Sequence, residues 1–250
     1  FLSNFKLVIN DEFKNLKNFL LNIRTFFQEN KNTIHKARNE IKVINYENKD
    51  LVVKSFKIPN LINRIVYTFY RSSKAKKSYE YALKIKDFTP KPIGYIEFFK
   101  SGLISDSYFV SEKFDYDFTI REPLLDADFL NKNEVLKAFA KFSFDLHEAG
   151  IFHFDYSPGN ILIKKENENY IFKIVDINRM KFFELKLEDR LKNFCKLWAK
   201  DEDLTVVIKE YAKLMNKDEK LLVLEALKFS HKHKAKINFK KRLKGKKVVD

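Results

Sequence analysis

The spacing of apolar residues divides the chain into a strand-rich first part and a helix-rich second part. Short apolar runs predict five strands, at residues 5–9, 41–44, 51–56, 93–99 and 106–112. Apolar residues at helical spacing predict helices at 12–29, 72–85, 187–199, 205–214 and 219–229, and another from Asn131 onward. We therefore predict an α+β protein with a small, β-rich N-terminal lobe at 1–112 and a larger, helical C-terminal lobe at 113–250.

The helix that begins at Asn131 leads into the polar centre of the second part. Val135, Phe139 and Leu146 lie on one face of this helix and predict that it packs against a core. Asn131 with Glu134 three residues later resembles a capping arrangement, and Gly150 suits the end of the helix. We expect the helix to support the loop that follows.

That loop contains polar residues at a spacing used in phosphoryl transfer. His153, Asp155 and Asn160 form the pattern His-x-Asp-x-x-x-x-Asn, and Asp176 follows the apolar strand 170–175. Phosphoryl transfer needs a carboxylate near the acceptor hydroxyl and oxygen ligands for a divalent metal. Asp155, Asn160 and Asp176 can supply these groups. A short polar loop alone is often only a turn, but helix, loop, hairpin and strand in this order favour a kinase.

Two charged residues of the first part complete a kinase-like order. Lys54 lies on the strand 51–56, and Glu80 is the only acidic residue of the helix 72–85. In kinases such a lysine contacts the α- and β-phosphates and pairs with a helix glutamate. Taken singly, both residues are more often solvated surface residues, but their position before Asp155 favours the pair. The segment 111–114, with Glu112, falls where a hinge would face adenine.

Composition and charge narrow the class of protein. The 250 residues, 29.9 kDa in mass, suffice for a two-lobed domain, and a single cysteine excludes an intrachain disulfide. No apolar run approaches the roughly 20 residues that span a bilayer, so we expect a cytoplasmic protein, with peripheral attachment to the inner membrane left open. The net charge of +15 favours polyanionic partners such as nucleic acid, an anionic membrane or a phosphorylated glycolipid. Compositional bias of a Lys-, Asn- and Phe-rich chain is the alternative.

Together, five segments resemble the bacterial lipopolysaccharide kinases of the Kdo/heptose kinase (WaaP/KdkA-like) family, within the protein-kinase-like superfamily. They are Lys54–Lys57, Arg71–Ala82, Thr89–Glu97, His153–Asn160 and Asp176–Arg179. The resemblance implies a two-lobed protein-kinase-like fold, the cofactors ATP and Mg²⁺, and lipopolysaccharide or a lipid A precursor as the substrate. It also implies that Asp155 is the catalytic base, that Asn160 and Asp176 bind the metal, and that Lys54 with Glu80 positions the phosphates.

The chain departs from the protein-kinase pattern at three places. The segment 34–41, where a Gly-rich loop is expected, contains no glycine, so Arg38 or Lys36 would have to contact phosphate instead. Phe154 replaces the arginine of the catalytic loop. Asn178 replaces the glycine after the metal-binding aspartate, and no Ala-Pro-Glu follows. The last two features favour a glycolipid or small acceptor over a protein.

Other functions stay open at this point. A protein or small-metabolite kinase would use the same fold, because a fold does not determine the substrate. A pseudokinase scaffold is disfavoured by the presence of all five kinase-type residues, and the missing glycines are the feature that favours it. Nucleic-acid binding is not expected, since the basic C-terminal stretch has no recognition motif and contains only one aromatic residue, Phe239.

Overall fold

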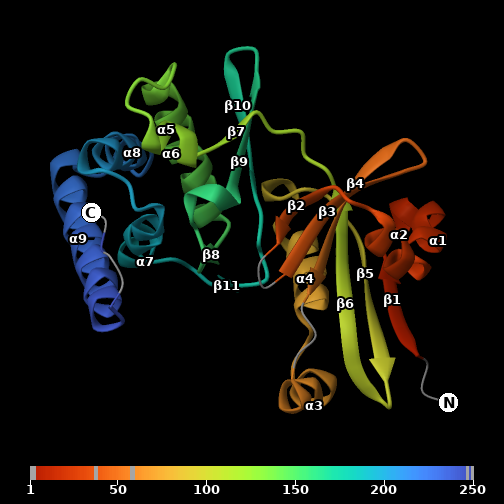
Figure 1. Ribbon diagram of the computed structural model, residues 1–250. Coiled ribbons are helices and arrows are strands. Elements are labelled where there is room, and N and C mark those ends of the chain that lie inside the picture. Colours follow the sequence, from red (N-terminus) through yellow and green to blue (C-terminus); the bar gives the residue numbers. More distant parts are fainter. Residues whose placement is uncertain (1–3, 37–38, 57–59, 246–247, 249–250) are drawn as a thin grey trace. The chain divides into compact units, whose positions relative to one another are not determined.

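The computed structural model describes residues 4–36, 39–56, 60–245 and 248, with the side chains of 34–36 left aside (Figure 1). It divides the chain into two compact units, Phe1–Phe114 and Asp115–Asp250. Their boundary lies after Phe114, whereas the sequence placed it after Glu112. The predicted α+β class is confirmed, since the first unit is built on a sheet and the second is mainly helical.

The first unit contains an antiparallel sheet of six strands in the order β1-β5-β6-β4-β3-β2. Five strands lie at the predicted places, and β2 was not predicted. A two-residue turn at Glu47 and Asn48, both with positive φ, joins β3 to β4, as is usual for tight hairpins. The strands are β1 (Phe5–Ile9), β2 (Thr33–Lys36), β3 (Asn39–Tyr46), β4 (Lys49–Phe56), β5 (Pro92–Lys100) and β6 (Leu103–Glu112).

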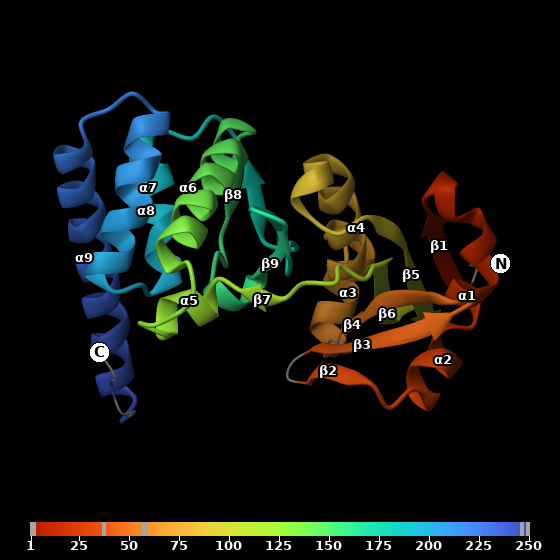
Figure 2. The same ribbon diagram turned by 90° about the horizontal axis from the view of Figure 1, so that it is seen from above.

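Helices cover both faces of this sheet (Figure 2). One face packs against η1 (Asp11–Leu16), α1 (Lys17–Leu21) and α2 (Ile23–Glu29), and the other against α4 (Lys74–Ile85). The prediction of a single helix at 12–29 is wrong. Phe13 has non-helical dihedral angles, and the chain leaves the helical conformation again at Asn22. Gly94 permits the close approach of β1, since an added Cβ would lie 2.6 Å from the Val8 carbonyl oxygen.

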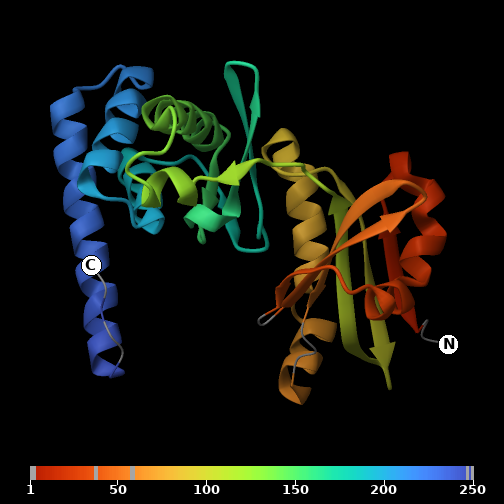
Figure 3. The same cartoon turned by 45° about the horizontal axis from the view of Figure 1, so that its top comes forward.

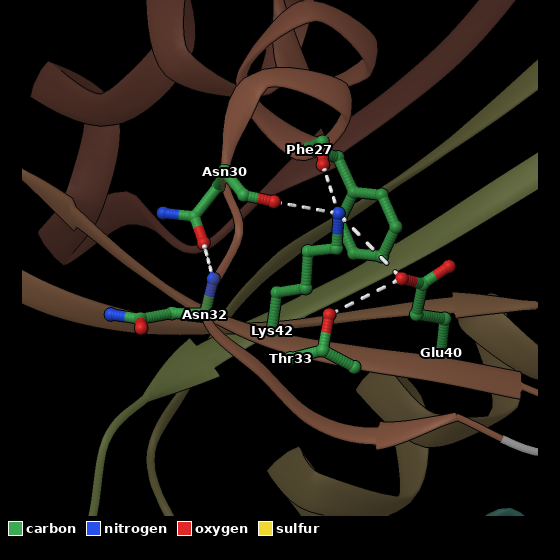
Figure 4. A network of polar contacts seen from close by, with 6 residues as sticks. All are labelled: Phe27, Asn30, Asn32, Thr33, Glu40 and Lys42. Atoms are coloured by element: carbon green, nitrogen blue, oxygen red, sulfur yellow. Dashed lines mark hydrogen bonds and ion pairs between the residues drawn. The ribbon is translucent and has the colours of Figure 1, made fainter.

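A buried lysine anchors the first helical layer to the sheet (Figure 4). The Nζ atom of Lys42, on β3, donates to the carbonyl oxygens of Phe27 at 2.6 Å and Asn30 at 2.8 Å. It also lies 3.6 Å from a carboxylate oxygen of Glu40. The last carbonyls of a helix have no partner within the helix, and Lys42 satisfies that of Phe27 near the end of α2, together with the carbonyl of Asn30 just after it.

Two further helical elements of this unit are short. The helix α3 (Leu61–Phe69) was not predicted from the sequence, and η2 (Lys86–Phe88) follows α4. The predicted helix 72–85 begins two residues late because Ser73 caps it: its hydroxyl accepts from the amide of Lys76 at 3.0 Å.

The second unit is helical, with short strands around the predicted catalytic loop. Its helices are α5 (Arg121–Leu125), α6 (Lys132–Glu148), α7 (Leu187–Phe194), η4 (Cys195–Leu197), α8 (Asp201–Leu214) and α9 (Glu219–Leu243). Its strands are β7 (Phe118–Thr119), β8 (Ile151–His153), β9 (Ile161–Glu166), β10 (Asn169–Ile174) and β11 (Met180–Phe182), with η3 (Pro158–Asn160) inside the loop. The strands pair as β10-β9-β7 and as β11-β8.

Three local predictions in this unit are wrong. Asn131 precedes α6 in a left-handed conformation, and its side chain makes no capping hydrogen bond. The helix predicted at 187–199 ends at Phe194, after which η4 turns the chain at Trp198, where φ is positive. The helix predicted to end at Phe229 continues to Leu243. No helix in the described ranges has the length and apolar character needed to cross a bilayer.

Candidate active site

The loop after α6 is held in place by its own histidine. Gly150, with φ +70°, ends α6 and lets the chain enter β8, which stops at His153. The amide of Asp155 donates to Nδ1 of His153 at 3.0 Å, so Nε2 carries the hydrogen and donates to the carbonyl of Val175 at 3.2 Å. Burial lowers the pKa of His153, which keeps the ring neutral. The imidazole therefore joins the segments that carry Asp155 and Asp176.

Asn160 makes a second connection between the same segments. Its Nδ2 donates to the carbonyl of Asp155 at 2.9 Å, and its own carbonyl accepts from the amide of Val175 at 2.9 Å. Because Nδ2 is used inside the loop, the amide oxygen Oδ1 is the atom left for a cation. Asp155, Asn160 and Asp176, predicted as one site, thus belong to one hydrogen-bonded framework.

Asp176 itself has an unusual backbone and an unpredicted side-chain partner. Its φ is +57°, in the left-handed region that aspartate tolerates better than most residues. Nδ2 of Asn178 donates to Oδ1 of Asp176 at 2.8 Å. Asn178, which the sequence showed only as a departure from glycine, therefore orients the carboxylate. Next to it, the carbonyl of Arg179 accepts from the amide of Phe154 at 3.0 Å.

A buried polar chain supports the loop from the helical side. Arg190 donates to the hydroxyl of Tyr211 at 3.5 Å, and Tyr211 lies 2.8 Å from Nδ1 of His147. Nε2 of His147 lies 3.1 Å from Oδ1 of Asn193, whose Nδ2 donates to the carbonyl of His153 at 2.8 Å. Since an amide oxygen only accepts, Nε2 carries the hydrogen and Tyr211 donates to Nδ1. Burial lowers the pKa of His147 to about 4, so the ring is neutral.

Arg121 adds a positive charge beside the loop. Its guanidinium lies against Gly159, where an added Cβ would come within 2.6 Å of Nη2. Arg121 is exposed, and it has no carboxylate partner in the part of the chain that the structure describes. Sequence reasoning missed this residue, because only the fold brings α5 next to η3.

The oxygen atoms of this framework suit a hard cation. Mg²⁺ is usually held by one or two carboxylates, with water and substrate phosphates completing the octahedron. Asp176, oriented by Asn178, and Oδ1 of Asn160 fit this requirement. The described residues hold no cluster of three or more His, Cys, Asp or Glu side chains, so the donor set does not resemble a structural zinc site.

In the first unit, Lys54 and Glu80 lie on a strand and a helix that pack together, but among the described contacts of Glu80 there is no ion pair with Lys54. Strand alternation puts half-buried Lys54 on the same sheet face as Phe56, against which α4 packs. Glu80 is on α4 but is exposed, and its ion pair in the described chain is with Lys76, at 3.7 Å. The predicted lysine and the predicted helix therefore share one face of the sheet, but the Glu80 carboxylate pairs with Lys76, one turn earlier on its own helix.

The other two residues predicted to contact nucleotide give less information. Arg38 lies outside the described residues. Glu112 ends β6, two residues before the boundary between the units, and is exposed. Its amide donates to the carbonyl of Lys91 at 2.9 Å, and that of Lys113 donates to Asp50 at 3.2 Å. The position suits a hinge, but these two N–H groups are already used within the first unit.

Comparisons with known proteins identify the fold. No protein-family model matches the sequence, and no curated protein matches it either. Among solved structures, one described as WaaP in complex with acyl carrier protein matches with a TM-score of 0.58 and 14% identity, covering 91% of this chain and 99% of that chain. Similarity at this identity shows the fold alone. The chain thus has the two-lobed, protein-kinase-like α+β fold of WaaP, as the sequence motifs predicted.

Proposed function

We propose that the protein is an ATP-dependent kinase that phosphorylates a sugar hydroxyl, of Kdo or heptose, in the inner core of lipopolysaccharide. The observation that carries the proposal is the framework in which His153 and Asn160 join the segments of Asp155 and Asp176. Such a framework holds a carboxylate and two oxygen ligands in a fixed relation, which phosphoryl transfer requires. The WaaP fold supports the same reaction class.

In this proposal each residue of the loop has one task. Asp155 accepts the proton of the sugar hydroxyl as the oxygen attacks the γ-phosphorus, and the bond from that phosphorus to the ADP oxygen breaks. Asn160 and Asp176 hold Mg²⁺, which when bound neutralises charge on the phosphate oxygens. Asn178 keeps the Asp176 carboxylate directed, and His153 keeps the two segments at a constant separation.

Residues of the first unit are proposed to hold the nucleotide. Lys54 contacts the α- and β-phosphates, and Glu80 orients Lys54 when ATP is bound. The pair that Glu80 makes with Lys76 is exposed and worth only about 0.3–0.5 kcal/mol, so a phosphate-bound Lys54 can compete for the carboxylate. Arg38 contacts phosphate in place of glycine amides, and Glu112 belongs to the hinge beside adenine.

Arg121 is proposed to help bind the acceptor. An exposed guanidinium beside η3, without a carboxylate partner among the described residues, can form paired hydrogen bonds to a phosphate or carboxylate. Inner-core sugars of the Kdo type and lipid A carry such groups. An anionic glycolipid therefore suits this side of the loop better than a neutral metabolite.

The test is Mg²⁺-dependent transfer of labelled γ-phosphate from ATP to purified inner-core lipopolysaccharide and, in parallel, to a Kdo-bearing lipid A precursor. We expect Asp155→Ala to lower turnover by roughly 10²–10⁴-fold while ATP affinity stays nearly unchanged, because Asp155 acts on the acceptor. We expect Asp176→Ala to abolish transfer. Asp128→Ala, an exposed aspartate of the same unit, serves as the matched control.

The outcomes separate the alternatives. Transfer to either acceptor that is lost in the Asp176→Ala variant supports the sugar kinase. Transfer only to a protein or a small metabolite would show that the proposed acceptor is wrong, while the proposal that the protein is a kinase would stand. ATP binding without transfer to any acceptor would favour a pseudokinase, and near wild-type turnover in Asp155→Ala would remove Asp155 from its role.

A further inference from the structure

The helix α3 presents its apolar residues to solvent. Leu61, Ile62, Ile65 and Phe69 are 63%, 73%, 41% and 68% exposed, and Tyr70, just after the helix, is 81% exposed. At 3.6 residues per turn, the four helical side chains fall within about a third of the circumference. A surface helix of a globular protein normally turns such a stripe toward the core. Here the stripe faces outward.

Two polar residues of α3 that flank the apolar stripe, both partly buried, attach the helix to the protein. Nε of Arg64 donates to the carbonyl of Ile104 at 2.8 Å, and its Nη2 donates to the carbonyl of Lys100 at 3.1 Å. The hydroxyl of Thr68 accepts from the amide of Ile104 at 3.0 Å. These bonds fix the rotation of α3 on β6 and on the turn that precedes it. The outward direction of the apolar stripe is therefore built into the fold.

The surroundings of the stripe are basic. Arg71 and Lys74 are exposed and follow α3 directly, and Lys77 comes one turn later on α4. The sequence 60–79 contains five basic residues, Arg64, Arg71, Lys74, Lys76 and Lys77, and no Asp or Glu. Figures 1 and 3 show α3 at the periphery of the first unit, beyond one end of α4. The apolar stripe thus lies on an outer surface with positive charge beside it.

We propose that α3 docks the protein on an anionic phospholipid bilayer. A short helix with large apolar side chains on one face and basic residues nearby can lie in the membrane interface, with its apolar face among the acyl chains and its basic residues at the headgroups. The same positive charge opposes pairing with a second copy of this face. The proposal rests on the orientation of α3 and does not require phosphate transfer.

Binding of the 250-residue chain to sedimenting vesicles tests this inference. Vesicles of phosphatidylcholine with about 30% phosphatidylglycerol are compared with vesicles of phosphatidylcholine alone. We expect binding to the anionic vesicles and a loss of roughly tenfold or more in partitioning for Ile62→Ser/Phe69→Ser, because the apolar contact supplies much of the affinity. Arg71→Gln/Lys74→Gln should weaken binding several-fold, and more so at low salt.

A matched control exists on α9. Leu221 and Leu224 are 66% and 68% exposed, close to the values for Ile62 and Phe69, so Leu221→Ser/Leu224→Ser removes similar apolar surface elsewhere. It should bind vesicles as the wild type does. Because all four side chains are exposed, circular dichroism should show the same fold in every variant.

Three results would overturn the inference. One is absence of wild-type binding to the anionic vesicles, and another is unchanged binding by Ile62→Ser/Phe69→Ser. The third is a wild-type dimer in light scattering that this variant converts to a monomer, since α3 would then be covered by a second copy. None of these results bears on the kinase assignment, which the transfer assay tests separately.

Discussion

The two groups of predicted site residues differ in how the chain holds them. Asp155, Asn160 and Asp176 are linked by hydrogen bonds of a single loop and one hairpin, and the sequence spacing alone indicated their relation. Lys54 and Glu80 lie on a strand and a helix far apart in sequence, and Glu80 pairs with Lys76 instead. The sequence spacing of site residues determines their relative positions when hydrogen bonds within one short segment hold that segment together. It does not fix which neighbour an exposed side chain selects.

The largest expected effect concerns the well-connected loop of this comparison. It is the pH dependence of the free energy of unfolding that comes from His147, whose polar chain supports the loop. Burial lowers its pKa from 6.5 to about 4, so the folded protein binds a proton less readily than the unfolded chain. The stabilisation is fully present above pH 6.5 and is lost as the pH falls toward 4, by about 3 kcal/mol. Urea unfolding at pH 7, 5.5 and 4.5 measures this loss.

A variant isolates the contribution of His147. In His147→Gln the free energy of unfolding should depend less steeply on pH between 6.5 and 4, since this ring no longer takes up a proton on unfolding. His153 contributes in the same direction and stays in both proteins. Equal slopes for the wild type and the variant would contradict the prediction.

A smaller effect is expected from Asn178, which orients Asp176. Asn178→Ala removes one hydrogen bond to a carboxylate, and we expect transfer to fall about tenfold with little change in stability. Asn45→Ala is the matched control, because Nδ2 of Asn45 makes the same bond to Asp50, also at 2.8 Å, on the surface of the first unit. Equal turnover in the two variants would show that Asn178 does not matter to the reaction.

Arg121 should affect the acceptor and leave the nucleotide unaffected. Arg121→Met keeps the aliphatic stem against Gly159 and removes the charge, so we expect the KM for an anionic acceptor to rise several-fold while kcat and ATP affinity stay close to wild type. Steady-state kinetics at varied acceptor concentration measures both constants. A fall in kcat alone would argue against a role in acceptor binding.

The smallest effect tests the first unit. Lys76→Met removes an exposed pair with Glu80, and the free energy of unfolding should change by no more than about 0.5 kcal/mol. If Glu80 turns to Lys54 when ATP binds, Lys76→Met keeps its ATP affinity and Glu80→Gln loses affinity. Nucleotide titration of both variants decides the matter, and unchanged affinity in Glu80→Gln would remove Glu80 from the site.

The sequence predicted the elements whose pattern is local and missed those whose pattern depends on distant partners. Gly150, the hairpin before Asp176 and the strand of Lys54 follow from periodicity and turn chemistry. The helix α3 was not predicted although its apolar residues have helical spacing; what the sequence could not show is that these residues face solvent while Arg64 and Thr68 hold the helix to β6. The prediction that Asn131 caps α6 is wrong, because its backbone adopts a left-handed conformation in which the side chain makes no capping hydrogen bond. The position of Arg121 beside the loop could be found only from the fold, which brings α5 next to η3.

The polar chain from Arg190 to His153 has a consequence for local opening of the molecule. Tyr211, His147 and Asn193 come from three different helices, and the chain that they form ends on the carbonyl of His153, at the start of the predicted catalytic loop. Exposing the amides of Asp155 and Val175 to solvent therefore requires separation of packed helices, which is a near-global event. These amides should be among the slowest to exchange with deuterium, so the loop proposed to perform the chemistry should behave as part of the most stable cooperative unit of the second half of the chain.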